Sequence, residues 1–401
     1  MRLKAMLVGA GVLASLVVGV PSANADEAFY SPPSPLPAGA DGDVLKSQPS
    51  TYAGAKATRV MYLSRNAKNQ PIPVTGTVIV PEKTWAGPGE RPIVAYAPFT
   101  AGMGDQCAPS KTLAGEGGDL AAGFQKQFVD TLLGKGFAVA QTDYEGLGTP
   151  GDHTYVMRLS EARTVLDVVR AAQRLPGAGL PADGPVGIAG YSEGGGAAAS
   201  AAELASDYAP DLDVRGVYSG APPADKAKLA KSLDGSLYAA FLGYALIGIN
   251  AAYPESKVYD LANDTGKKFF EDAAKTCTMG GVMGLMFKNT KTLTKDGRPV
   301  AEYMTQAPFS AIVAENRIGT LKPAMPVLVE HALLDDAIPH EHGRLMSKDW
   351  CGKGANVTFR NLASFPLFGH ALGMLTAKNN AATWLGDRFA GKPVTGNCGT
   401  L

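Results

Sequence analysis

The chain has 401 residues, of which 18% are charged and 45% are hydrophobic, and its formal net charge is zero. This composition is typical of a globular protein that is long enough to bury a large core. The balanced charge excludes a basic field that would hold nucleic acid, and it excludes an acidic tail.

The first 25 residues predict a secretory signal peptide (1–25). Arg2 and Lys4 precede an apolar run, and the small residues Ala23 and Ala25 form a cleavage-type site. The alternative is an N-terminal membrane anchor, but the run is short for a span, which needs about 20 residues. We therefore expect cleavage near Ala25 and a secreted protein, located outside the cell or in its envelope.

Export would place the four cysteines in an oxidising compartment, where disulfide bonds are the default. They are Cys107, Cys277, Cys351 and Cys398, and none forms a C-x-x-C pair. A zinc site is therefore disfavoured, and we expect two disulfide bonds. Four cysteines allow three pairings, and spacing alone does not choose among them.

The segment 26–50 is rich in proline and glycine, which predicts an extended arm over the surface without a helix. The main domain, 51–401, opens with three strand-like segments at 58–64, 75–80 and 92–98. The third is mostly apolar, as expected for a strand that is covered on both faces.

Strands and helices then alternate. A helix from residue 128 that ends at Gly134 or Gly136 leads into an apolar strand at 137–143. A helix over 160–177 with Ser160 as its N-cap follows, and strands are expected at 186–190 and 214–222. This alternation predicts an α/β fold with a mainly parallel sheet and helices on both faces.

The alternation of strands and helices stops between Pro223 and Lys322, where the sequence has helical periodicity and no buried strand. Strands return at 324–332 and 356–362, and a helix from Leu372 to Phe389 ends the domain. We therefore interpret 223–322 as a helical cap that is inserted within a single α/β domain.

The stretch "GIAGYSEGGGAAAS" (187–200) places Ser192 in a G-x-S-x-G motif. A strand ends directly before it and a helix of small residues begins directly after it, which is the context that this motif needs. The serine must occupy a sharp turn, and flanking glycines let neighbouring backbone approach. The positive end of the following helix then lies where an oxyanion would form. We predict that Ser192 is the nucleophile of an α/β-hydrolase fold.

A nucleophilic serine needs a base and an orienting carboxylate, and in this fold the chain order is Ser, Asp or Glu, then His. His153 precedes Ser192 and fails on this order. His370 lies between the last strand and the last helix, where the base is expected. Asp335 follows the preceding strand and is the favoured carboxylate, with Asp336 as the alternative.

A competing interpretation joins nearby polar residues into a metal site: His331, Asp335, His340, Glu341 and His342. The "HEH" spacing differs from H-E-x-x-H, and adjacent residues on a loop seldom converge on one ion. We expect neither a metal nor a cofactor.

The oxyanion would be held by backbone N–H groups. In this fold one comes from the residue after the nucleophile, Glu193, and the other comes from the loop after the strand at 92–98. In that loop we predict Thr100, with Phe99 as the alternative.

Beyond single motifs, the chain resembles the secretory lipase family of α/β hydrolases, the yeast lipase A type, which actinobacteria and yeasts share. The resemblance covers nearly all of the mature chain. It rests on these segments, in order: "FYSPPSPLP", "DGDVLKSQP", "VMYLSRNAKNQPIPVTGTVIVP", "CAPS", "TDYEGLG", "GYSEGG", "DDAIP" and "GH".

The resemblance implies a secreted lipase or esterase that acts on acylglycerols or related acyl esters, with an acyl chain held by the helical cap. The family's triad maps onto Ser192, Asp335 and His370. No obligate protein partner is implied, and transient contact with a lipid interface is compatible with the family.

The resemblance also implies the disulfide pairs Cys107–Cys277 and Cys351–Cys398. Glu193 departs from the family, because yeast members tend to have glycine there. It supplies the same N–H group but adds a charge, which favours esterase activity over activity on long-chain lipids.

The helical block offers apolar surface for an acyl chain, in which Met279, Met283 and Met286 would suit a variable guest. Core packing is the alternative role of these methionines. Two other functions use the same residues or scaffold: an acyltransferase with the same triad, and a secreted binding protein without catalysis. A peptidase is compatible with the fold, but nothing in the sequence marks a peptide subsite.

Overall fold

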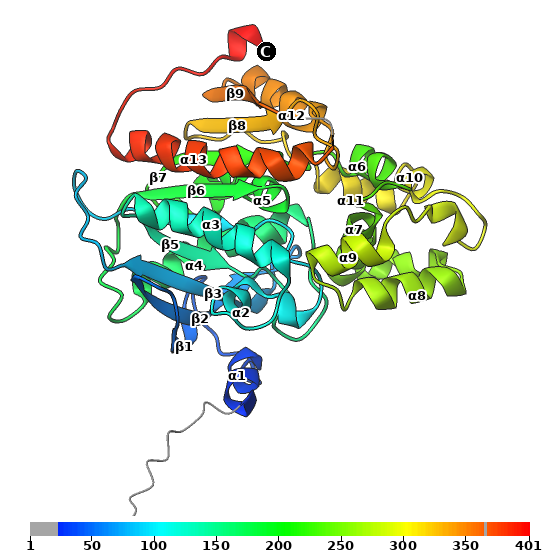
Figure 1. Cartoon of the computed structure of the whole chain (residues 1–401), viewed down its shortest axis with the longest axis horizontal. Helices are drawn as coiled ribbons and strands as arrows, with labels where there is room; N and C mark the ends of the chain where they lie inside the picture. The colour runs from blue at the N-terminus through cyan, green and yellow to red at the C-terminus, as the bar shows by residue number, and fades with distance from the viewer. Residues whose placement is uncertain (1–22, 365–366) are drawn as a thin grey trace, which may run out of the picture.

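A computed structural model describes residues 23–364 and 367–401. Its centre is a nine-stranded sheet with the strand order β1-β2-β3-β5-β4-β6-β7-β8-β9 (Figure 1). The pairs from β1 to β5 along one edge are antiparallel, and the pairs from β5 through β4 to β9 are parallel. The expected mainly parallel sheet is confirmed.

The strands are β1 (Val44–Ser50), β2 (Ala55–Arg65), β3 (Pro71–Pro81), β4 (Ile93–Ala97), β5 (Ala138–Thr142), β6 (Val186–Tyr191), β7 (Val214–Gly220), β8 (Val327–Ala332) and β9 (Val357–Leu362). Every residue of β4, β5, β6 and β8 is buried. These strands read as continuous apolar runs in the sequence because helices cover both faces of the sheet.

Two helical layers cover the sheet. One core cluster joins it to α4 (Arg158–Arg174), α5 (Glu193–Tyr208) and α12 (Glu341–Gly352). Another joins its opposite face to α3 (Leu120–Gly134) and α13 (Gly369–Phe389). The small residues of α5 allow close packing, since a Cβ atom at Gly195 would lie 2.0 Å from the carbonyl oxygen of Gly220.

Between β7 and β8 the chain forms α6 (Lys226–Leu233), α7 (Ala239–Ala252), α8 (Asp264–Ala273), α9 (Thr278–Leu285), α10 (Val300–Tyr303) and α11 (Phe309–Glu315). Residues 223–322, all of which the structure describes, contain no strand. We call them the helical segment. Its helices share a separate apolar cluster and lie together at one end of the sheet (Figure 1). Their role as a cap stays a prediction.

Two disulfide bonds are present, Cys107–Cys277 and Cys351–Cys398, with Cα atoms 5.4 and 5.5 Å apart. This is the pairing that the family resemblance implies. The first bond ties the helical segment to the loop after β4, next to α2 (Pro109–Thr112), and the second ties α12 to the C-terminal tail. Bonds of this kind typically stabilise a fold by about 2–4 kcal/mol each.

The expectation of an extended arm over 26–50 is wrong in part. The helix α1 (Ala23–Tyr30) enters this range, and β1 joins the sheet by antiparallel pairing with β2. The prolines that prevent a helix begin only at Pro32, after α1 has ended. The signal peptide predicted for 1–25 lies mostly outside the described residues.

Three helix predictions also need correction. Ser160 is not an N-cap, because α4 already begins at Arg158, and its hydroxyl instead donates to a Glu145 carboxylate oxygen at 2.5 Å. The helix α3 begins at Leu120 rather than near residue 128. Asp119 is its N-cap and accepts a hydrogen bond from the N–H of Ala121. The "HEH" residues do not form a loop, since α12 begins at Glu341. None of the helices described is both long enough and apolar enough to cross a bilayer.

Candidate active site

Ser192 occupies the turn between β6 and α5. Its φ and ψ angles are 59° and −123°, a conformation that residues with a side chain rarely adopt. Its N–H donates to the carbonyl oxygen of Gly220 at 2.9 Å. Cβ atoms at Gly190 and Gly194 would lie 2.0 Å from the carbonyl oxygens of Gly194 and Ala97, respectively. The two glycines of the motif are therefore required by close backbone contacts on both sides of Ser192.

His370, the second residue of α13, bridges Ser192 and Asp335. Its Nε2 atom lies 2.8 Å from Ser192 Oγ, and its Nδ1 atom lies 2.8 Å from Asp335 Oδ2. Because a carboxylate only accepts hydrogen bonds, Nδ1 carries the hydrogen and Nε2 is free to accept the serine proton. The sequence placed these three residues after strand ends, which are those of β6, β8 and β9, and the structure brings their side chains together.

Asp335 is buried and strongly hydrogen-bonded. Its Oδ1 atom accepts from the backbone N–H groups of Ala337 and Ile338 at 3.0 and 2.7 Å. Burial alone would raise the pKa of Asp335, but the charge of His370 and hydrogen bonds from His331 and His370 hold the pKa well below its ordinary value. Asp335 is therefore ionised at neutral pH.

His370 responds to the same pair from the other side. Burial lowers the pKa of His370, but the charge and hydrogen bond of Asp335, with a contribution from the charge of Asp336, outweigh burial and raise the pKa above its ordinary value. The site therefore favours the imidazolium that would form when His370 takes a proton.

Asp336 fills a different place from Asp335. Its Oδ1 atom accepts from the backbone N–H of His370, and its Oδ2 atom accepts from the N–H of Phe368, each at 3.0 Å. The Tyr238 hydroxyl also donates to Oδ2, at 3.1 Å. Asp336 thus binds the backbone N–H groups around His370, and none of these bonds involves the imidazole ring. The geometry therefore favours Asp335 as the partner of the imidazole.

Sequence reasoning missed several supporting residues. The Tyr191 hydroxyl donates to the carbonyl oxygen of His370 at 2.7 Å, and His331 Nε2 lies 3.5 Å from Asp335 Oδ2. Tyr191 is the residue before the predicted nucleophile, so the motif itself gave a position at which to look. No pattern in the sequence marks Tyr238, because it acts through a contact between distant segments. The sequence offered His331 only as a candidate metal ligand, and its contact with Asp335 depends on how the loop after β8 folds.

The residues of the competing metal interpretation have other partners. His331 pairs with the carbonyl oxygen of Ile338 at 2.9 Å, His340 with Asn361 at 2.8 Å, and Glu341 with Lys228 at 3.1 Å. Within the ranges that the structure describes, no group of three or more His, Cys, Asp or Glu side chains could hold a metal ion.

Ser192 and His370 open onto a cavity of about 260 Å³. It is lined by Phe99, Thr100, Ala121, Phe124, Tyr191, Ser192, Leu237, Tyr238, Phe241, Thr278, Met279, Val282, Phe368, His370, Ala371 and Met374. Of the three methionines proposed from the sequence, only Met279 is among these residues. Met283 and Met286 do not line it, and 63% and 39% of their surface is accessible.

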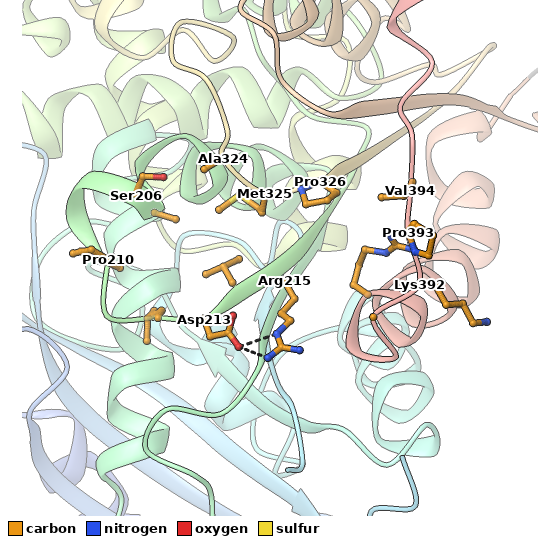
Figure 2. Close-up of a pocket in the computed structure, with 16 residues that line it drawn as sticks. Ser206, Pro210, Asp213, Arg215, Ala324, Met325, Pro326, Lys392, Pro393 and Val394 are labelled. Atoms are coloured by element: carbon orange, nitrogen blue, oxygen red, sulfur yellow. Dashed lines mark hydrogen bonds and ion pairs between the residues drawn. The ribbon is translucent and has the colours of Figure 1, made fainter. Parts of the chain in front are cut away.

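A second cavity of about 700 Å³ lies away from Ser192, near the start of β7, the residues before β8 and the chain that follows α13 (Figure 2). Asp213 and Arg215 form an ion pair of 2.7 Å on its wall. No predicted catalytic or oxyanion residue lines it. The smaller cavity is therefore the candidate site.

One of the two predicted oxyanion donors directly follows Ser192 in the chain, and the other lines the same cavity. Glu193 is the first residue of α5, and Thr100, in the loop after β4, lines the cavity and is 2% exposed. The Thr100 hydroxyl bonds to the Tyr155 hydroxyl at 2.8 Å. That the backbone N–H groups of Thr100 and Glu193 hold an oxyanion stays a prediction.

The sheet, the serine turn and the helical layers define an α/β hydrolase. The structure of Candida antarctica lipase A in its closed state superposes with a TM-score of 0.82 at 24% identity, over 93% of this chain and 87% of that one. The cell-wall-degrading esterase LipA of Xanthomonas oryzae superposes with a TM-score of 0.71 at 19% identity, over 87% of this chain and 98% of that one. These likenesses confirm the α/β-hydrolase fold.

Residues 118–397 match the family model described as secretory lipase. A probable inactive lipase of Mycobacterium tuberculosis is 30% identical over 387 residues, 92% of this chain and 83% of the relative. A secreted triacylglycerol lipase of Malassezia globosa, LIP3, is 27% identical over 93% of this chain and 83% of the relative. The chain belongs to the secretory lipase family, as the resemblance indicated. Because these relatives include both active and inactive proteins, activity must be argued from the site.

Proposed function

We propose that this protein is a secreted carboxylic ester hydrolase that acts on acylglycerols or related acyl esters. The observation that carries the proposal is the connected pair of 2.8 Å contacts from Ser192 through His370 to Asp335. This arrangement is the geometric signature of nucleophilic catalysis by serine. Membership of a family that contains secreted triacylglycerol lipases supports the substrate class and the location.

In the first half of the reaction, Ser192 Oγ bonds to the ester carbonyl carbon while its proton passes to Nε2 of His370. The carbonyl electron pair moves to the oxygen, where the N–H groups of Glu193 and Thr100 stabilise the negative charge. Asp335 keeps the ring in the correct tautomer and stabilises its positive charge. The carbon–alkoxy bond then breaks, and the proton on Nε2 passes to the leaving alcohol oxygen.

In the second half, water attacks the acyl-enzyme. His370 takes a proton from the water as its oxygen bonds to the acyl carbon, and a second oxyanion forms in the same place. The bond between the acyl carbon and Ser192 Oγ then breaks, and the proton on Nε2 returns to Oγ. The carboxylic acid leaves and the protein is restored, without a cofactor.

The cavity supports an acyl substrate because its lining is almost wholly apolar. Three apolar side chains that line the cavity are also exposed, and we call them the apolar rim: Phe124, Met279 and Phe368. Exposed apolar surface beside a binding site is typical of contact with a lipid or another apolar partner. The rim therefore supports transient contact with a lipid interface.

The alternative of a non-catalytic binding protein draws support from the probable inactive lipase of Mycobacterium tuberculosis. The proposed function and this alternative differ over Ser192 and His370. Hydrolysis of p-nitrophenyl esters from acetate to palmitate should be measured for wild type, Ser192→Ala, His370→Ala and Ser200→Ala. Ser200 is the matched control, because its hydroxyl is buried in α5 and bonds to the Gly196 carbonyl oxygen at 2.7 Å.

We expect wild type and Ser200→Ala to hydrolyse the esters, and the other two variants to lose about 10⁴-fold or more in kcat. Equal activity in wild type and Ser192→Ala would contradict the proposed function. Adding an alcohol to the assay separates hydrolase from acyltransferase, since an acyltransferase would form a new ester in preference to the free acid.

A further inference from the structure

The side chain of Glu193 lies buried behind the serine turn and does not reach solvent. It is 1% exposed, and its Oε1 atom lies 2.9 Å from Nε2 of His153, which is also buried. The sequence suggested that Glu193 adds a charge beside the nucleophile. The structure shows a carboxyl group enclosed by protein. Its protonation state therefore depends on its hydrogen-bond partners and on the charges nearby.

Hydrogen-bond donors and acceptors place a proton between Glu193 and His153. Nδ1 of His153 lies 3.0 Å from the carbonyl oxygen of Glu145, which only accepts, so Nδ1 carries a hydrogen. In a neutral ring Nε2 then has no hydrogen, and Glu193 must be the protonated partner that donates to it.

The burial of both groups puts this proton on the carboxyl group. Burial lowers the pKa of His153, which favours the neutral ring. Burial also raises the pKa of Glu193 to about 8, although hydrogen bonds with Glu161 and Thr100 and the charge of Lys226 oppose it. At neutral pH the Glu193 side chain is therefore a neutral carboxylic acid.

The same carboxyl group reaches the second predicted oxyanion donor. The side chain of Thr100 lies near enough to the Glu193 carboxyl group to lower its pKa, and the Oγ1 atom of Thr100 lies 2.8 Å from the Tyr155 hydroxyl. One side chain thus joins its own backbone, the loop after β4 and the segment between β5 and α4. This segment carries both His153 and Tyr155.

Other titratable groups face Glu193 from each element packed against it. Glu161 on α4 has a pKa raised well above its ordinary value by burial and by the nearby charge of Glu193. Lys226 on α6 has a pKa lowered to about 8 by burial. Tyr144 and Tyr155 have pKa values raised by burial and, in part, by Glu193, and so stay neutral. If Glu193 ionised, its negative charge would lie next to a second buried acid, Glu161.

We propose that Glu193 is a positioning residue, whose neutral carboxyl group holds the two backbone donors of the oxyanion hole by bonding to His153 on one side and Thr100 on the other. The proposal deepens the function proposed above and rests on it. Ionisation of Glu193 would break the donor bond to His153. It would also add a negative charge close to the oxyanion of the transition state, which raises the barrier.

The test is the pH profile of kcat/KM for a soluble ester between about pH 6 and about pH 10. Hydrolysis is monitored by titrating the acid that is released. Wild type should lose activity as the pH rises through about 8, where Glu193 ionises. Glu193→Gln should lack this alkaline loss. Its amide can donate to His153 and accept from Thr100 but cannot ionise, so we expect at least about a third of the wild-type kcat at pH 7.

Glu193→Ala removes both bonds and should lower kcat about 10- to 100-fold with little change in KM, because the oxyanion donors act mainly in the transition state. Glu330→Gln is the matched control. Glu330 is also a buried acid, bonded to Tyr218 and Asn380, but lies on β8. This control should keep the alkaline loss.

The outcomes separate the two proposals. If wild type keeps full activity up to about pH 9, the positioning role is overturned. This outcome is measured on the wild-type protein alone, so it does not depend on whether a variant folds. An alkaline loss that persists in Glu193→Gln overturns it as well, while the need for Ser192 and His370 stands. If Ser192→Ala is as active as wild type, the proposed hydrolase itself fails, whatever the profile of Glu193→Gln.

Discussion

The sheet edge that carries Ser192 and the helical segment that encloses the cavity are built in different ways. At the sheet edge, backbone contacts fix the geometry, since side chains at Gly190 or Gly194 would collide with carbonyl oxygens at 2.0 Å. In the helical segment, an apolar cluster of its own holds the helices, and Gly284 on α9 has no neighbour within 4 Å of an added Cβ. The serine turn thus rests on backbone contacts that tolerate no added atoms, whereas the outer side of α9 at Gly284 has room for them.

The largest expected effect contrasts the two adjacent acids at the sheet edge. Asp335→Asn should lower kcat about 10⁴-fold, because the amide cannot hold His370 in the required tautomer. Asp336→Asn keeps an acceptor for the backbone N–H of His370 and should cost about tenfold or less. Steady-state kinetics of the two variants will check this, and equal losses would contradict the separate roles of these residues.

A matched pair of glycine substitutions compares the two regions directly. Gly194→Ala should abolish most activity, by about 10²-fold or more, and lower the free energy of unfolding by about 1–3 kcal/mol through overpacking. Gly284→Ala should raise this free energy by about 0.4–1 kcal/mol, because alanine fits a helix better than glycine. Urea unfolding and ester hydrolysis measure both. A harmless Gly194→Ala would show that the serine turn is less constrained than its contacts indicate.

The cavity wall should set chain length without affecting the chemistry. Met279→Phe adds volume to the lining and should reduce kcat/KM for long-chain esters about tenfold, with short-chain esters little changed. Met283→Phe, one turn further along α9 and exposed, should leave the preference as it is. A p-nitrophenyl ester series on both variants provides the measurement. Equal changes for all chain lengths would place the acyl chain elsewhere.

The smallest expected effect is a shift in the acid side of the pH profile. Activity should fall as the pH decreases through the pKa of His370, which lies above its ordinary value partly because of the charge of Asp336. Asp336→Asn removes that charge, lowers the pKa of His370 and should move the acid loss to lower pH. A pH profile of kcat/KM compared with wild type checks the direction, and a shift to higher pH would contradict it.

The sequence was informative where local pattern and chain order decide the structure. Buried strands such as β6 appear as apolar runs, and Ser192, Asp335 and His370 follow strand ends in the order that the fold requires. It favoured Asp335 over Asp336 as the carboxylate, but it did not predict that Asp336 binds the backbone N–H of His370, because this contact depends on where the folded loop points the side chain. The pairing of β1 with β2 was missed for a similar reason, since it depends on a distant partner.

The Cys107–Cys277 bond attaches one part of the helical segment, the start of α9, covalently to the loop after β4. Thr278, the first residue of α9, directly follows the bonded cysteine, so Met279 is anchored to the loop that also carries Thr100. The helix α7, which contributes Phe241, has no such covalent anchor to the loop. Tyr244 on α7 is held beside this bond only by hydrogen bonds, to Thr276 Oγ1 at 2.7 Å and to the Cys277 carbonyl oxygen at 3.4 Å. We therefore expect a bulky guest to displace α7 more readily than α9.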